Sequence, residues 1–105
     1  MPQPRSDEAA ASGRSEASTT ITHPTGLHAR PAVKLTQLAA TFASAVSLRV
    51  GDAAEWVDAK SIVKVMRLKA RPQSVLHLRA VGPDAEEAVR SLVALVERDF
   101  DERAG

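Results

Sequence analysis

The spacing of apolar residues predicts three helices. Apolar side chains recur every three or four positions over residues 32–42 and again over 85–96, which places them on one face of an amphipathic helix. A shorter apolar cluster over 62–68 follows Ser61, a residue type favoured as a helix N-cap. At the start of the last helix, the segment Asp84–Glu87 resembles a capping box in which Asp takes the usual Ser or Thr position.

Four further segments are predicted to be strands. Apolar and polar residues alternate over 46–50 and over 76–80, as in strands with one buried face. Residues 18–23 are rich in Thr, and residues 55–59 can form a short strand that returns from the turn signal Gly51-Asp52. The order β-α-β-β-α-β-α predicts an α+β fold. We expect an open-faced two-layer sandwich, in which three helices cover one face of a four-stranded antiparallel sheet.

Composition limits the chain to one small domain. The chain has 105 residues, of which 44% are hydrophobic, so a single core is expected. Residues 1–17 contain no Val, Ile, Leu or aromatic residue, and we expect them to form a disordered tail or linker. Residues 18–101 are then the folded domain, and residues 102–105 a disordered C-terminal end.

Charge and residue usage exclude several classes of function. The absence of cysteine rules out disulfides and thiolate metal sites. A net charge of +1 and an aromatic content of 3% disfavour a nucleic-acid-binding module. No apolar run reaches the roughly 18 residues of a membrane helix, and the chain start lacks the apolar segment of a secretory signal. We therefore expect that the protein neither binds nucleic acid nor inserts into a membrane.

The segment Thr25–Ala32 is the strongest candidate for chemistry. Pro24 and Gly26 turn the chain sharply out of the first predicted strand. Pro31 suits the first turn of a helix, where its missing N–H removes a donor that would have no partner within the helix. This arrangement places His28 at or next to the helix N-cap.

A histidine at the N-cap position is expected to lie next to groups that bind anions. The unpaired N–H groups of the first helical turn bind anions, and the guanidinium of Arg30 can pair with a phosphoryl group. The helix dipole and Arg30 both favour an uncharged imidazole, whose bare nitrogen is a nucleophile. The pattern fits reversible phosphoryl transfer onto His28. A lone histidine in a first turn is more often a polar surface or capping residue, and spacing alone leaves both interpretations open.

Two motifs resemble those of a known family. The string GLHARPA, residues 26–32, resembles the active-site signature of the histidine-containing phosphocarrier (HPr) family of the bacterial phosphoenolpyruvate-dependent sugar phosphotransferase system. The string DAKSI, residues 58–62, with Val65-Met66 and Leu68 after it, resembles the family's regulatory-serine segment. The resemblance covers residues 18–101, and the predicted order of strands and helices agrees with the family's open-faced sandwich.

The resemblance implies a phosphoryl carrier that is not itself an enzyme. His28 would be phosphorylated at Nδ1, and Arg30 would stabilise the phosphohistidine. Thr25, Gly26 and Ala29 would form the loop around the phosphate. Enzyme I would donate the phosphoryl group and a IIA component or domain would accept it. The family carrier binds no cofactor or metal, and we expect a cytoplasmic monomer.

The second motif implies regulation and partner docking. Ser61 matches the position that HPr kinase/phosphorylase modifies in some family members, although an N-cap role alone would also explain it. The residues that match the family's docking patch are Lys60, Ile62, Val63 and Met66. The amphipathic pattern assigns Val65 and Leu68 to the core, and leaves Ile62 and Met66 exposed.

The chain departs from the family pattern at several positions. Lys64 and Lys69 stand where many carriers have glycine, and residues 60–71 contain five basic and no acidic side chains. That cluster is either a solvated face or a surface complementary to an acidic partner. These departures, with the tail, leave an alternative open: a regulatory HPr-like protein, or a domain of a multidomain dihydroxyacetone-kinase or fructose-type system. It would act through Ser61 or in a branch that transports no sugar.

Three other residues have less defined expectations. His23 is expected to be a surface residue at the end of the first strand. His77 alternates with leucines, so it should lie on the open face of the sheet. Trp56, the single tryptophan, could anchor either the sheet or a partner.

Overall fold

The computed structural model describes residues 13–101, which form four strands, three α-helices and a short 3-10 turn. In chain order these are β1 (Arg14–Thr20), α2 (Ala29–Ala40), β2 (Ala45–Val50), β3 (Val57–Asp58), α3 (Ile62–Arg67), β4 (Val75–Val81), α4 (Ala85–Glu97) and η1 (Asp99–Asp101).

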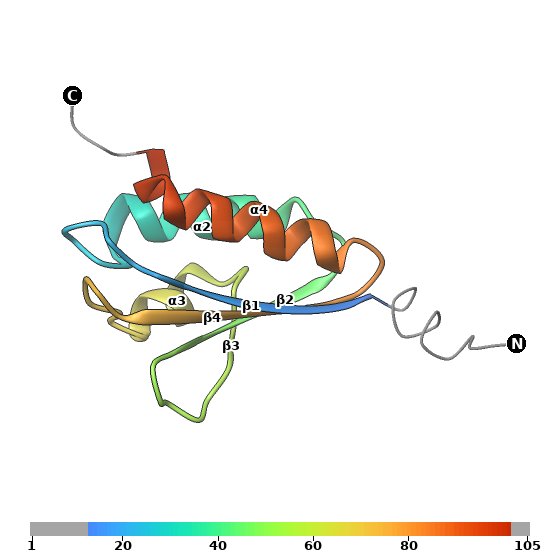
Figure 1. Ribbon diagram of the computed structural model, residues 1–105, viewed down its shortest axis with the longest axis horizontal. Helices are drawn as coiled ribbons and strands as arrows, with labels where there is room; N and C mark the ends of the chain where they lie inside the picture. The colour runs from blue at the N-terminus through green and yellow to red at the C-terminus, as the bar shows by residue number, and fades with distance from the viewer. Residues whose placement is uncertain (1–12, 102–105) are drawn as a thin grey trace, which may run out of the picture.

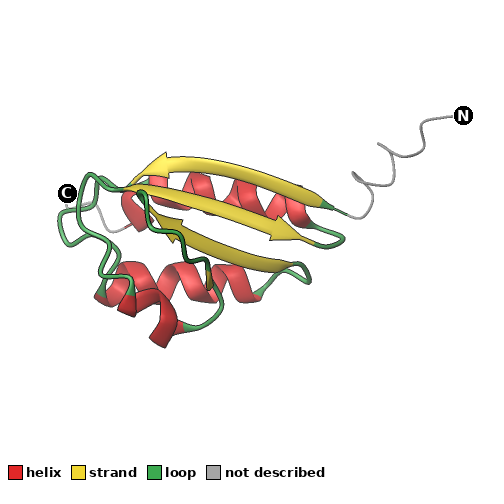
Figure 2. Cartoon of the chain, turned by 90° about the horizontal axis from the view of Figure 1, so that it is seen from below, coloured by secondary structure: helices red, strands yellow, loops and turns green. Residues whose placement is uncertain are grey.

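The strands form one antiparallel sheet in the order β1-β4-β2-β3. Helices α2 and α4 lie side by side above this sheet in Figure 1, and the view from below leaves the strands in front of the helices (Figure 2). Helix α4 packs on β1 and β4, while α2 packs against α3 and α4. The predicted open-faced sandwich is confirmed. No helix in the described range combines the length and apolar character needed to cross a bilayer.

The first strand begins earlier than the sequence pattern predicts. It runs from Arg14 to Thr20, where Arg14 pairs with Val81 and Thr20 with Val75. The expectation of a tail through residue 17 is therefore wrong for residues 14–17. Pairing with the neighbouring strand, together with packing of Ala17 against the core, orders a segment whose own composition is not strand-like. Residues 1–12 of the predicted tail and the predicted C-terminal end lie outside the described residues.

The core lies between the sheet and its helices, as the periodicity requires. Alternate residues of β4 are buried, and in β2 Val46 and Leu48 are buried while Val50 is half-buried; paired residues in adjacent strands face the same side. The largest fully buried apolar side chains come from strands, helices and loops alike: Ile21, Leu27, Leu35, Leu48, Leu76, Leu78, Leu92 and Phe100.

Trp56 packs on the face of the sheet that no helix covers. Its ring lies 4.0 Å from the Arg79 guanidinium carbon and 5.1 Å from that of Arg49, distances that permit cation–π attraction. His77 lies on this open face too, since its neighbours Leu76 and Leu78 are buried. The placement of His77 agrees with the prediction, and Trp56 serves as an anchor for the sheet.

Asp84 does not form the predicted capping box. It is the N-cap residue of α4, but its side chain makes no capping hydrogen bond. Its carboxylate instead accepts hydrogen bonds from the amides of Ala43 and Ser44, both at 2.9 Å, and from the Ser44 hydroxyl at 2.6 Å. The carboxylate therefore ties the start of α4 to the loop before β2, a contact that a local motif cannot reveal.

This contact predicts a specific dependence of stability on pH. Hydrogen bonds to the Asp84 carboxylate lower its pKa below the ordinary value of 3.8. The bond from the Ser44 hydroxyl has the largest effect, and the bond from the Ala43 amide the next largest. The stabilisation is thus fully present above pH 3.8 and is lost as the pH falls through the lowered pKa. Urea unfolding of the wild type and Asp84→Asn should differ most near pH 7, and the difference should narrow in acid. Glu87→Ala, which would disrupt a capping box, should change stability at pH 7 by less than about 0.5 kcal/mol.

Candidate functional site

A tight turn leads the chain from β1 to α2 and sets the position of His28. The Gly26 amide donates to the His23 carbonyl at 2.9 Å, and Gly26 has a positive φ of 69°. The next amide, that of Leu27, donates to the Ala70 carbonyl at 2.9 Å, and the Leu27 side chain is fully buried. These two hydrogen bonds and the buried Leu27 side chain fix the turn before the helix begins.

His28 occupies the N-cap position of α2, as predicted. Its backbone is extended, and its side chain makes no capping bond to the helix amides. The residue is exposed, and the imidazole has no hydrogen bond or ion pair to any residue within 13–101. An exposed ring at the N-terminus of a twelve-residue helix lies in the positive field of the helix dipole.

The first turn of α2 carries no negative charge. It contains no acidic residue, Arg30 is exposed beside His28, and Pro31 is buried. Ala29 has a φ of 53°, a left-handed conformation that costs a non-glycine residue roughly 1–2 kcal/mol. The surrounding anchors hold this strained residue in place. The turn therefore presents cationic and N–H groups next to an exposed imidazole, the arrangement expected for an anion-binding site.

The C-terminal turn η1 braces the loop before His28, a feature that the sequence patterns do not predict. The Thr22 hydroxyl donates to Asp99, and Lys34 Nζ donates to the Phe100 carbonyl at 3.1 Å. His23 is 8% exposed and packs edge-on against the Phe100 ring, with centroids 6.1 Å apart. The expectation that His23 is a surface strand residue is wrong, because β1 ends three residues earlier and the chain turns inward there.

Ser61 caps helix α3, as predicted. Its hydroxyl accepts a hydrogen bond from the Lys64 amide at 3.3 Å. Lys60, just before it, donates from Nζ to the Phe42 carbonyl at 2.8 Å, so the start of α3 lies near the end of α2. His28 lies at the other end of α2, a helix of 12 residues that is about 18 Å long. Ser61 and His28 are therefore not brought together.

The apolar residues of α3 divide differently from the prediction. Val65 is fully buried, as expected, whereas Leu68 is only half-buried. Ile62 and Met66, expected to be exposed, are half-buried and pack against the core. Among the apolar residues of this six-residue helix, Val65 alone is buried and Val63 alone projects outward, with 57% of its surface exposed.

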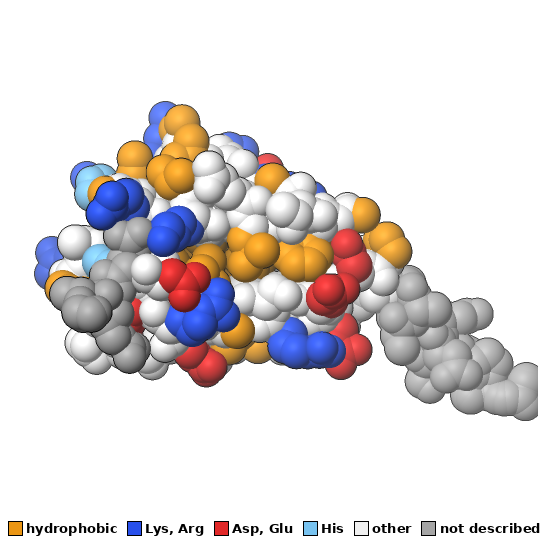
Figure 3. Space-filling view, turned by 90° about the horizontal axis from the view of Figure 1, so that it is seen from above, with side chains coloured by type: hydrophobic (Ala, Val, Ile, Leu, Met, Phe, Trp, Pro, Cys, Tyr) orange, Lys and Arg blue, Asp and Glu red, His pale blue; other side chains and the backbone are white. Residues whose placement is uncertain are grey.

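Basic side chains gather at one end of the molecule. Figure 3 shows Lys and Arg side chains clustered with histidine at the left end. Lys64, Arg67, Lys69 and Arg71 are exposed, whereas the bond to Phe42 holds Lys60 half-buried. Lys69 has a φ of 51°, a conformation that suits glycine, while Lys64 lies within α3.

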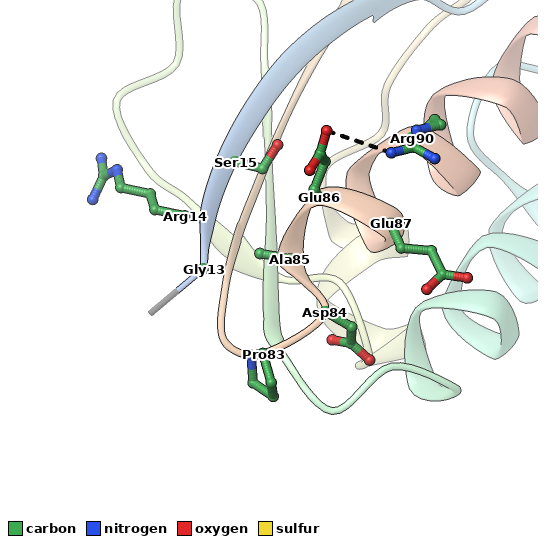
Figure 4. A pocket seen from close by; sticks show the side chains of 9 residues that line it. All are labelled: Gly13, Arg14, Ser15, Pro83, Asp84, Ala85, Glu86, Glu87 and Arg90. Carbon is green, nitrogen blue, oxygen red and sulfur yellow. Dashed lines mark ion pairs between the residues drawn. The ribbon is translucent and has the colours of Figure 1, made fainter. Parts of the chain in front are cut away.

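A polar hollow at the opposite end of the domain has the wrong charge for the same chemistry. It lies between the start of β1 and the start of α4, where three carboxylates, those of Asp84, Glu86 and Glu87, outnumber the guanidinium groups of Arg14 and Arg90. Arg90 pairs with Glu86 at 3.4 Å (Figure 4). Its carboxylates would repel a phosphoryl group. In the described part of the chain, no group of three or more His, Asp or Glu side chains is arranged to hold a metal ion.

Comparisons with known proteins agree with this geometry. A family model described as the phosphorylation site of the phosphotransferase-system HPr component matches residues 15–98. A phosphocarrier protein HPr from Cupriavidus necator is 46% identical over 84 residues, which are 80% of this chain and 92% of that protein. A phosphocarrier protein NPr from Proteus mirabilis is 40% identical over 77 residues, 73% of this chain and 84% of that one.

The fold comparison leads to the same group of proteins. A crystal structure of HPr-C-His from Thermoanaerobacter tengcongensis superposes with a TM-score of 0.80 and 39% sequence identity. The superposition covers 86% of this chain and 99% of that one.

Proposed function

Because the chain belongs to the HPr family of the phosphotransferase system, we propose that His28 accepts a phosphoryl group from phosphorylated enzyme I and passes it to a IIA-type acceptor. The family consists of phosphocarrier proteins, so the chain serves phosphotransferase enzymes as a substrate and is not an enzyme itself. The observation that carries the assignment of His28 is its exposed imidazole at the N-cap of α2, beside Arg30 and without an acidic neighbour in the first turn.

The proposed step is a substitution at phosphorus. The lone pair of His28 Nδ1 forms the new bond to phosphorus while the bond from phosphorus to the donor breaks. The positive end of α2 and the guanidinium of Arg30 offset the negative charge of the transferred group. Thr25, Gly26 and Ala29 shape the loop beside the phosphate. Since the imidazole is exposed, the carrier can present it to two partners in turn, which suits a cytoplasmic monomer.

Labelling with phosphoenolpyruvate tests the proposal. The chain is incubated with phosphoenolpyruvate, magnesium and catalytic enzyme I, and its mass is then measured. We expect one phosphoryl group per chain, stable in alkali and lost in acid, as a phosphohistidine requires. A chain that takes up no label, or takes up a label that survives acid, would contradict the proposal.

The surface around Val63 is proposed to dock the partners. Val63 is the most exposed large hydrophobic residue in the described range, and Lys64 and Arg67 of the same helix are exposed as well. An apolar centre with a charged rim is typical of a protein interface. Half-buried Ile62 and Met66 contribute their outer edges, and the basic residues favour an acidic partner. Lys60, whose Nζ donates a hydrogen bond to the Phe42 carbonyl, contributes its charge at the margin of this surface.

A matched pair of variants tests the docking surface. Val63→Asp should raise the KM of enzyme I for the carrier by about tenfold, the effect of losing an interface residue worth more than 1 kcal/mol. Val75→Asp is the control, since Val75 is 40% exposed but lies on the open face of the sheet. The control should keep the wild-type KM. Equal KM values for the two variants would place docking elsewhere.

A regulatory role for Ser61 is a second proposal. Phosphorylation would replace a hydroxyl that caps α3 with a dianion beside Val63 and the basic residues. Because Ser61 lies at the far end of α2 from His28, the phosphate would act on partner docking and not on the imidazole. HPr kinase/phosphorylase with ATP should then give an acid-stable label that Ser61→Ala lacks. The physiological acceptor is left open, since relatives include both HPr and NPr proteins.

A further inference from the structure

His23 is a buried titratable residue with no part in the reaction described above. It precedes the turn that leads to His28, and it is 8% exposed. Its ring nitrogen Nδ1 lies 3.1 Å from the Thr25 amide nitrogen, which donates to it. A backbone amide can only donate, so Nδ1 must carry a lone pair and no proton. The contact therefore specifies a neutral imidazole with its proton on Nε2.

The same lone pair is shared with the Thr25 side chain. Thr25 Oγ1 lies 3.0 Å from His23 Nδ1 and 3.3 Å from the Gly26 carbonyl oxygen, so its hydroxyl proton can be directed at either. If Nδ1 carried a proton, two donors, the Nδ1–H of His23 and the N–H of Thr25, would face each other. The hydrogen bond from the Thr25 amide to His23 would then be lost. The arrangement of donors around Thr25 is therefore consistent with one tautomer only.

His23 also links this turn to the C-terminal turn. Its carbonyl accepts the Gly26 amide at 2.9 Å, and its ring packs against the fully buried Phe100. The residue thus holds the turn from both its backbone and its side chain. Thr25 itself is exposed, so water could take the place of the ring as acceptor and allow the turn to open.

We propose that His23 is a positioning residue for phosphoryl transfer: its unprotonated Nδ1 fixes Thr25 and thereby the backbone that places His28. The inference rests on the proposed function of His28 and adds a residue that never contacts the phosphoryl group. Transfer between two proteins is sensitive to small displacements of the accepting atom. A side chain that anchors the turn three residues before His28 therefore contributes to the rate.

Two substitutions distinguish the effect of the hydrogen-bond acceptor of His23 from the effect of its side-chain volume. His23→Asn keeps an acceptor, since Asn Oδ1 can occupy the place of Nδ1, but loses the ring. His23→Leu keeps apolar volume against Phe100 but has no acceptor. We expect the rate of His28 phosphorylation by enzyme I to fall about tenfold in His23→Leu and to stay within about twofold of wild type in His23→Asn.

A difference in stability between the two variants cannot explain why His23→Leu should be phosphorylated more slowly than His23→Asn. Both variants lose the edge-on contact with Phe100, and the more polar asparagine is expected to lower the melting temperature further. If the two rates follow the melting temperatures, or if both equal the wild-type rate, the positioning role is wrong. If the wild type itself takes up no label, the function proposed for His28 fails instead.

A spectroscopic measurement tests the tautomer without any phosphoryl transfer. Long-range proton–nitrogen correlation spectra of the wild-type chain at neutral pH distinguish a bare ring nitrogen from a protonated one. We expect the His23 signals to be those of an unprotonated Nδ1 and a protonated Nε2. A proton on Nδ1, or a rapidly exchanging mixture of tautomers, would overturn the inference whether or not either variant folds.

Discussion

Replacement of His28 by alanine will abolish acid-labile phosphorylation and leave the fold almost unchanged. The imidazole is exposed and makes no capping bond, so its removal deletes the nucleophile without deleting a structural contact. The free energy of unfolding should change by less than about 0.5 kcal/mol. Mass spectrometry after incubation with phosphoenolpyruvate and enzyme I measures the label, and thermal unfolding measures the stability.

The other histidine on the domain surface provides the control for this substitution. His77 is half-buried on the open face of the sheet, away from α2, so His77→Ala should be labelled to the same extent as the wild type. Label in His28→Ala at the wild-type rate would show that another residue accepts the phosphate. Arg30→Ala should be labelled more slowly but still to completion, because it keeps the nucleophile and loses only charge stabilisation.

The elements that a local pattern determines could be predicted from the sequence. The helices α2 and α4 have enough turns for a period of 3.6 to be evident, and β2 and β4 alternate cleanly. The N-cap position of His28 could be predicted for a similar reason. Gly26 and Pro31 restrict the backbone on either side of it, and few arrangements satisfy both.

The features that depend on distant contacts could not be predicted. The spacing of Asp84 and Glu87 fits a capping box, yet the Asp84 carboxylate accepts hydrogen bonds from amides about 40 positions earlier. Residues 14–17 are ordered by pairing with β4, which composition does not reveal. The positions of His23 and Phe100 depend on how the C-terminal turn returns to the loop before α2. Such contacts follow from the assembled fold and leave no periodic trace.

Replacement of Gly26 by alanine is expected to give the largest combined loss of stability and activity. Gly26 has a φ of 69°, and a Cβ at this position would lie 2.2 Å from the Ala70 carbonyl oxygen. That oxygen also accepts the Leu27 amide, so relief of the clash must disturb the hydrogen bond that anchors the chain just before His28. The phosphorylation rate should therefore fall together with the stability.

The expected loss of stability is about 2–4 kcal/mol, the sum of a left-handed backbone penalty and a steric clash. At about 4–8 °C per kcal/mol for a domain of this size, the melting temperature should fall by at least about 8 °C. Gly51→Ala is the matched control, since Gly51 has a similar φ of 55° but no atom within 4 Å of a new Cβ.

The control should lose only the backbone penalty, about 1–2 kcal/mol, and should be phosphorylated at the wild-type rate. The difference between the two alanine variants then measures the close approach of Gly26 to the backbone of residues 70 and 71. Equal melting temperatures and equal rates for Gly26→Ala and Gly51→Ala would mean that the loop tolerates a side chain at Gly26. In that event the close approach to Ala70 could not be what positions His28 at the start of α2.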